Sequence, residues 1–109
     1  MNAYLVERYL PGVSESELRS RLGRVEALCR ELSAEGTEIH YAGSIFLPLE
    51  ESCFCRFECE RPETVAEINQ RAQLAYARIT AGIAITPEVN VAPEPTNQPS
   101  EVQRDVNPI

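Results

Sequence analysis

The stretch VSESELRSRLGRVEALCRELSAEG, residues 13–36, has the pattern of one amphipathic helix with both of its ends marked. Ser14 and Glu17 have the spacing of a capping box, in which the serine hydroxyl accepts a hydrogen bond from the amide of Glu17. Gly36 suits the left-handed residue that ends many helices. Between these ends runs an apolar stripe at steps of four and three, made of Leu18, Leu22, Val25, Cys29 and Leu32. The pattern predicts a helix that packs one face on a sheet.

Strands are predicted on both sides of this helix. Residues 3–10, AYLVERYL, come before it and are rich in β-forming residues, and residues 37–47, TEIHYAGSIFL, come after it, with Gly43 as a candidate for a β-bulge. Residues 53–60, CFCRFECE, alternate strictly. One face of this strand carries Cys53, Cys55, Phe57 and Cys59, and the other carries Phe54, Arg56, Glu58 and Glu60.

The second half of the chain repeats the order of the first. Pro62 suits the first turn of a helix, and residues 78–86, RITAGIAIT, read as a fourth strand. Between them, apolar residues recur at helical spacing at Val65, Ile68, Ala72 and Ala75. The order βαββαβ predicts an α+β, ferredoxin-like fold, with two helices on one face of a four-stranded antiparallel sheet.

The other face of this sheet is predicted to stay open. Counting residues along the second strand puts His40 and Phe46 on it, together with Phe54 from the third strand. An exposed apolar patch of this kind usually meets a partner, and a second copy of the sheet is the simplest one. We therefore expect a homodimer of the dimeric αβ-barrel type.

The composition changes near the end of the last predicted strand. Residues 87–109 hold five of the eight prolines of this 109-residue chain, no aromatic residue and more acids than bases. Such a segment buries too little apolar surface to order itself. We therefore predict one domain at 1–86 and a flexible, proline-rich acidic tail at 87–109.

Charge and residue usage exclude several functions. The net charge of −7 disfavours nucleic acid and anionic membranes as partners, and no apolar window is long enough to span a bilayer. The chain has no lysine and no aspartate before Asp105, which argues against a Walker loop, a Schiff-base enzyme and an EF-hand. Without an export signal, the four cysteines suggest a reducing, cytoplasmic location. No catalytic constellation emerges, so a non-catalytic role is favoured.

Three residues are candidates for a metal site. His40 is the only histidine, and parity places it on the open face with Glu58, so that these two and a second copy could bind a divalent metal. The alternative is a solvated histidine bonded to a carboxylate. Cys55 belongs to a cysteine row whose sulfurs we expect about 7 Å apart per step, from the strand rise, and too far apart for one ion. These cysteines are then small buried hydrophobes.

Glu7 and Arg8 interrupt an apolar strand, so each is expected to face one side of the sheet. A buried charge needs a partner. One interpretation is an internal ion pair, for example between Glu7 and Arg56 or Arg78. The other is that Glu7 is a ligand carboxylate in a pocket.

Three segments resemble a family of small bacterial proteins named for a nickel-binding, nickel-responsive member. They are YLVERYLPG at 4–12, CFCRFE at 53–58 and NQRAQLAYARI at 69–79. The resemblance implies a ferredoxin-like homodimer and binding of nickel or another divalent metal. Its matched positions include Glu7, Arg8, Cys55 and Asn69. Similar proteins often carry histidine where Asn69 stands, and asparagine is a poor ligand for nickel.

Three functions remain open on this basis. The first is a non-catalytic dimeric protein that binds a divalent metal or a small ligand, with His40, Cys55 and Glu58 as metal candidates. The second, by analogy of fold, is a cofactor-free small enzyme or small-molecule binder of the αβ-barrel type, with Glu7, Asn69 and Tyr76 lining its pocket. The third is a structural or interaction module whose tail docks on a partner.

Overall fold

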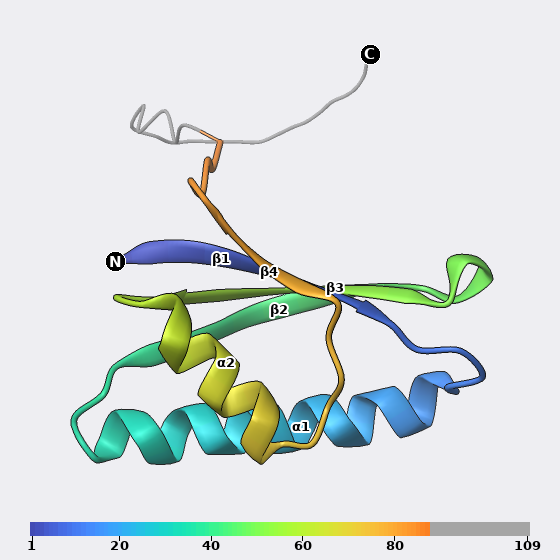
Figure 1. Cartoon of the computed structure of the whole chain (residues 1–109), viewed down its shortest axis with the longest axis horizontal. Helices are drawn as coiled ribbons and strands as arrows, with labels where there is room; N and C mark the ends of the chain where they lie inside the picture. Colours follow the sequence, from blue (N-terminus) through green and yellow to red (C-terminus); the bar gives the residue numbers. More distant parts are fainter. Residues whose placement is uncertain (88–109) are drawn as a thin grey trace, which may run out of the picture.

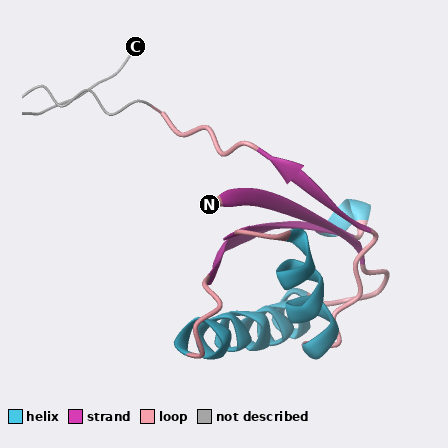
Figure 2. Ribbon diagram, turned by 60° about the vertical axis from the view of Figure 1, so that its left-hand side comes forward, coloured by secondary structure: helices cyan, strands magenta, loops and turns pink. Residues whose placement is uncertain are grey.

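The computed structural model describes residues 1–87 and shows two layers, a β-sheet and a layer of helices (Figure 1). The elements follow the predicted order βαββαβ. They are β1 (Asn2–Tyr9), α1 (Glu15–Ala34), β2 (Ile39–Leu47), the short 3₁₀ helix η1 (Pro48–Glu50), β3 (Ser52–Cys59), α2 (Pro62–Arg71) and β4 (Arg78–Gly82). All strand pairs are antiparallel, in the order β2-β3-β1-β4, and both helices lie on the same face of the sheet (Figure 2). The predicted ferredoxin-like fold is confirmed.

The capping signals of α1 operate as the sequence predicts. The Ser14 hydroxyl accepts a hydrogen bond of 3.1 Å from the amide of Glu17. At the other end Gly36 has φ +104°, and the amide of Thr37 donates to the Leu32 carbonyl at 3.0 Å. The Thr37 bond and the left-handed Gly36 are the marks of a Schellman motif, which satisfies carbonyls that the C-terminal end of the helix would otherwise leave free.

The core lies between the sheet and the helices. The apolar stripe of α1 packs against alternating residues of the three long strands, and α2 adds Val65 and Ile68. All three cysteines of β3 and Phe57 are fully buried on the helix-facing side. In the described part of the chain, no helix is long and apolar enough to cross a bilayer.

A β-bulge in β2 changes which side chains face the helices. The ladder between β2 and β3 pairs Tyr41 with Phe57 but then Gly43 with Arg56, so one residue of β2 is left over. Gly43 has φ +116°, a conformation that glycine adopts without strain. Beyond the bulge the alternation is inverted. Phe46 therefore packs against the core on the helix-facing side, and the prediction that it lies on the open face is wrong.

Two predicted elements are shorter in the structure. The helix predicted to run to Ala75 ends at Arg71, because Gln73 takes the left-handed conformation with φ 55°. The turn at Gln73 places Leu74 in the core in place of Ala75. The fourth strand ends at Gly82 rather than Thr86, because its pairing with β1 ends at Ala3 opposite Gly82, one residue from the start of β1 at Asn2. Apart from Pro87, the predicted tail lies outside the described residues.

Candidate functional site

Arg8 is a buried arginine near the end of β1. The alternation of β1 turns Tyr4, Val6 and Arg8 toward the helices, and Arg8 is only 2% exposed. Its guanidinium donates through Nε to Cys55 Sγ at 3.3 Å and through Nη2 to Asn69 Oδ1. A buried charge is costly unless it is paired and hydrogen-bonded. Among the described residues no carboxylate forms an ion pair with it, so the sulfur of Cys55 is the acidic group that it contacts.

The C-terminal end of α2 supplies the other partners of Arg8. The amide of Leu74 donates to the Asn69 carbonyl at 3.2 Å, which closes a Schellman motif around Gln73. This turn presents the carbonyls of Leu74 and Ala75, which accept from Arg8 Nη1 at 3.4 Å and 3.2 Å. A cation at the C-terminal end of a helix also interacts favourably with the helix dipole. Arg8 thus ties β1 to the end of α2.

Asn69 is held on both sides of its amide group. It is 1% exposed, its Nδ2 donates to the Val65 carbonyl at 2.7 Å, and its Oδ1 accepts from Arg8. Both ends of the amide are therefore used inside the protein. The structure gives Asn69 a positioning role for the Arg8 guanidinium.

Cys55 has the surroundings of a thiolate. Its Sγ accepts from Arg8 and from the Ser44 hydroxyl at 2.8 Å, and lies 3.8 Å from Cys53 Sγ. The hydrogen bond from Cys53 and the charge and hydrogen bonds of Arg8 and Ser44 outweigh burial and lower the pKa of Cys55 from 9.0 to about 6. The same contact with Cys55, together with burial, raises the pKa of Cys53. The pair therefore shares its charge unequally, with the negative charge on Cys55.

The expected spacing of about 7 Å between the sulfurs of Cys53 and Cys55 is wrong. That spacing applies to the backbone positions of residues two apart in a strand. Side chains in a strand lean along its direction, and rotation about χ1 moves each sulfur along the strand. The two thiols lean toward each other and meet at 3.8 Å.

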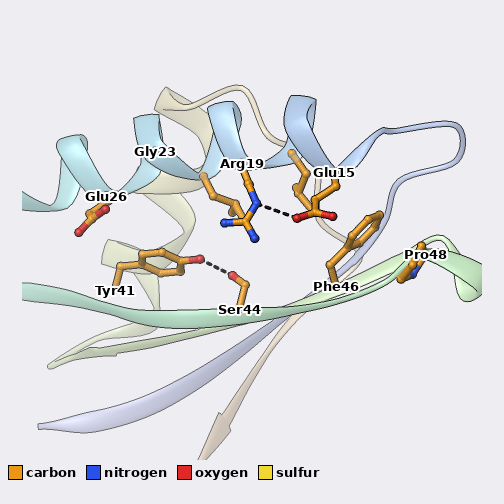
Figure 3. Close-up of a pocket in the computed structure, with 10 residues that line it drawn as sticks. Glu15, Arg19, Gly23, Glu26, Tyr41, Ser44, Phe46 and Pro48 are labelled. Carbon is orange, nitrogen blue, oxygen red and sulfur yellow. Dashed lines mark hydrogen bonds and ion pairs between the residues drawn. The ribbon is translucent and has the colours of Figure 1, made fainter.

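A pocket opens between α1 and β2 (Figure 3). Its volume is about 640 Å³. The helix contributes Glu15, Leu18, Arg19, Leu22, Gly23 and Glu26, and the strand side contributes Tyr41, Ser44, Phe46 and Pro48. The hydroxyls of Tyr41 and Ser44 are hydrogen-bonded to each other, and Ser44 in turn donates to Cys55. A chain of polar contacts therefore runs from the pocket wall through Cys55 to Arg8.

The residues predicted for a ligand pocket do not share one site. Glu7 lies on the open face, where its carboxylate accepts from Arg78 Nε at 2.8 Å, so the predicted Glu7–Arg78 ion pair is present. Asn69 and Tyr76 lie on the other side of the sheet and line one depression of about 390 Å³ at the end of α2. The sheet separates Glu7 from both.

The residues predicted for a metal site are also divided by the sheet. His40 and Glu58 face each other on the open face, where His40 Nε2 lies 2.8 Å from Glu38 and Glu58 pairs with Arg56 at 2.7 Å. Cys55 is buried on the helix-facing side beside the Arg8 cation. Between residues 1 and 87, no group of three or more histidine, cysteine or acidic side chains could hold a metal ion. The donors of one described chain therefore do not fit a nickel site.

Sequence reasoning missed the residues that build the pocket, above all Tyr41 and Ser44. The signal was Gly43, because a bulge at this glycine inverts the faces of all later residues in the strand. Applying that inversion moves Ser44 and Phe46 to the helix-facing side. The sequence indicates that Arg8 is a charge that needs a partner, but it does not identify that partner.

The family model described as "Nickel responsive protein SCO4226-like" matches residues 4–81. Among solved structures, the fold is similar to the crystal structure of SCO4226 from Streptomyces coelicolor A3(2), with a TM-score of 0.65 and 14% sequence identity. The alignment covers 78% of this chain and 99% of that one. No curated protein matches the sequence.

Proposed function

Because the chain belongs to the nickel-responsive, SCO4226-like family, we propose that it is a non-catalytic binding protein with a small-ligand site between α1 and β2. The observation that supports this function is the pocket of about 640 Å³, a volume in the range of small-molecule sites. Its lining combines the apolar side chains of Leu18, Leu22 and Phe46 with a few polar groups. This mixture is typical of sites that fix the orientation of a small organic molecule.

The charges around the pocket favour one class of ligand. Glu15, Arg19 and Glu26 line it, which gives two acids against one base, and the whole chain carries −7. The Arg19 guanidinium is already paired with Glu15 at 2.8 Å. An anionic ligand would meet repulsion here. We propose a neutral or cationic molecule with an apolar part and a group that bonds to the hydroxyl of Tyr41 or Ser44.

Filling the pocket from Gly23 tests this function. A Cβ added at this glycine has no heavy atom within 4 Å, so Gly23→Ala leaves the pocket nearly intact while Gly23→Leu occupies it. Benzylamine, phenol and benzoate serve as cationic, neutral and anionic probes, followed by amide chemical shifts. The buffer is reducing, since the four described cysteines are free and we propose a cytoplasmic location.

We expect benzylamine and phenol to shift resonances of the pocket residues in the wild type and in Gly23→Ala, and to lose this effect in Gly23→Leu. Benzoate should shift them little. Equal shifts in all three proteins would show that the probes bind elsewhere, and no shift with any probe in the wild type would remove the proposed site.

We also propose that the protein is a homodimer that pairs its open sheet faces. The described chain leaves this face of the sheet uncovered (Figures 1 and 2). The face carries Leu5 at 40% and Ile45 at 66% exposure, and Ile45 stands opposite Phe54. Covering such a patch with a second copy removes apolar surface from water. Sedimentation of the full chain should give a dimer, and Ile45→Glu should give a folded monomer. A monomeric wild type at micromolar concentration would contradict the proposal.

A second candidate function is binding of nickel or another divalent ion on the open face. It is favoured by the position of His40 directly across from Glu58, with Glu38 within 2.8 Å of the imidazole. One chain is short of ligands, but a dimer would contribute two copies of this set. Calorimetric titration with nickel should show binding that His40→Ala abolishes and that Cys55→Ser retains. Binding that survives His40→Ala would exclude this site.

A further inference from the structure

The sulfurs of Cys53 and Cys55 lie side by side in the core. Both cysteines are fully buried and free, and their Sγ atoms are 3.8 Å apart. Metal–sulfur bonds of about 2.3 Å let one ion reach two sulfurs up to about 4.6 Å apart. We propose that Cys53 and Cys55 form a two-sulfur site for a soft monovalent cation of the Cu(I) type. Thiolates are the ligands that such ions prefer.

The charge of the surrounding groups selects a monovalent ion. Two thiolates and one monovalent cation carry a net charge of −1, and the Arg8 guanidinium lies 3.3 Å from Cys55 Sγ. The complete site is therefore neutral. A divalent ion in the same place would leave a net charge of +1 in a buried site, where an uncompensated charge is costly.

The pocket between α1 and β2 is the side from which an ion would reach this site. In the ladder between β2 and β3, Ser44 stands opposite Cys55 and Phe46 stands opposite Cys53. Both of these residues of β2 line the pocket. The thiol pair therefore lies directly beside the pocket wall, and Ser44 already contacts Cys55 at 2.8 Å.

Binding requires no oxidation or reduction. Two metal–sulfur bonds form, the sulfur–hydrogen bonds that remain are broken, and each released proton passes to water. The site lies on the opposite side of the sheet from His40 and Glu58, so it is independent of the nickel candidate. The two-sulfur site uses the pocket between α1 and β2 only as an entrance, and it does not depend on an organic ligand bound in that pocket.

Cu(I) titration of the reduced, full-length protein under anaerobic conditions, against a chromophoric Cu(I) chelator, tests this site. The wild type should take up one Cu(I) per chain. Removing one of two ligands in Cys53→Ser should weaken binding by about 100-fold or more. The matched control is Cys29→Ser, which removes a buried thiol on α1 away from the pair and should change the affinity by less than about 3-fold.

Amide chemical shifts of the wild type locate the ion without any substitution. Residues Ser44, Cys53 and Cys55 should shift on addition of one equivalent, and Cys29 and Cys59 should not. Zn²⁺ and Ni²⁺ in excess should not displace the ion. In Arg8→Met, which has lost the balancing cation, the preference should move from Cu(I) toward Zn²⁺.

Three results would overturn the proposal. They are unchanged Cu(I) affinity in folded Cys53→Ser, loss of the first equivalent in Cys29→Ser, and displacement of Cu(I) by stoichiometric Zn²⁺. A wild type whose first equivalent shifts only the resonances around Cys29 and Cys59 would overturn it as well, even if no cysteine variant folds.

Discussion

Replacing Arg8 by methionine should remove the pH dependence of stability that its contact with Cys55 creates. Methionine keeps much of the length of the side chain and removes the charge and all the donors. Arg8 is 2% exposed and contacts Cys55 Sγ at 3.3 Å, so the sulfur would keep its burial and lose the nearby cation. The pKa of Cys55 should then rise from about 6, while the hydrogen bonds from Cys53 and Ser44, which also lower it, remain.

The sign and size of the effect follow from linkage. The pKa of Cys55 is lower in the folded protein than the ordinary value of 9.0, so the thiolate stabilises the fold fully above pH 9 and loses this effect as pH falls through 6. For a shift from 9.0 to about 6, the contribution is near zero at pH 5, about 1 kcal/mol at pH 7 and about 3 kcal/mol at pH 8. Above pH 9 the raised pKa of Cys29, about 11 because of its burial, acts in the opposite direction.

Urea unfolding between pH 5 and pH 8 in a reducing buffer measures this rise in the free energy of unfolding. The wild type should gain about 2–3 kcal/mol relative to Cys55→Ser across this range. Arg8→Met should show a smaller gain, because the cation beside Cys55 is lost. It should also be destabilised at every pH by about 2–4 kcal/mol, because the carbonyls of Leu74 and Ala75 and the amide oxygen of Asn69 lose their donor.

Ultraviolet absorbance of the thiolate provides an independent readout. It should appear near pH 6 in the wild type and only at higher pH in Arg8→Met. The matched control is Arg19→Met, which removes a side chain that is 77% exposed and paired with Glu15, and it should keep the wild-type profile. A wild type with no thiolate below pH 8, or an Arg8→Met variant with the wild-type slope, would refute the reasoning.

Three further substitutions test local features of the fold by urea unfolding. Gln73→Gly should stabilise the protein by about 1 kcal/mol, because Gln73 holds φ 55° at the end of α2. Gln70→Gly inside that helix should destabilise it by about as much, and a loss of stability in Gln73→Gly would contradict the assigned cap. Gly23→Ala should stabilise by about 0.5–1 kcal/mol because the new methyl group meets no atom within 4 Å, and a destabilised variant would mean that the position is crowded. Ser14→Ala should lower the free energy of unfolding by about 1 kcal/mol, because the hydrogen bond to the Glu17 amide is lost. Ser20→Ala at an exposed position of the same helix should not lower it, and equal effects of the two substitutions would argue against the cap.

The sequence by itself determined the fold, because each local signal in it is decided by neighbours along the chain. Ser14 and Glu17 begin α1, Gly36 ends it, and the alternation of residues 53–60 defines β3, all as the structure shows. The segments that resemble the nickel-responsive family lie in the matched range 4–81. The predicted elements differ from the structure only at their ends. The left-handed Gln73 follows the end of α2, and β4 ends where its pairing with β1 ends.

The site was decided by tertiary structure, because its contacts join residues that are far apart in the chain. The pairing of β2 with β3 fixed the bulge at Gly43, and that bulge turned Ser44 toward Cys55. The pairing of β1 with β3 brought Arg8 to Cys55, 47 residues away, and the packing of α2 on the sheet brought it to Asn69, 61 residues away. Parity along a strand predicts the face of a side chain only until the first bulge, and it says nothing about how far two sulfurs lean toward each other.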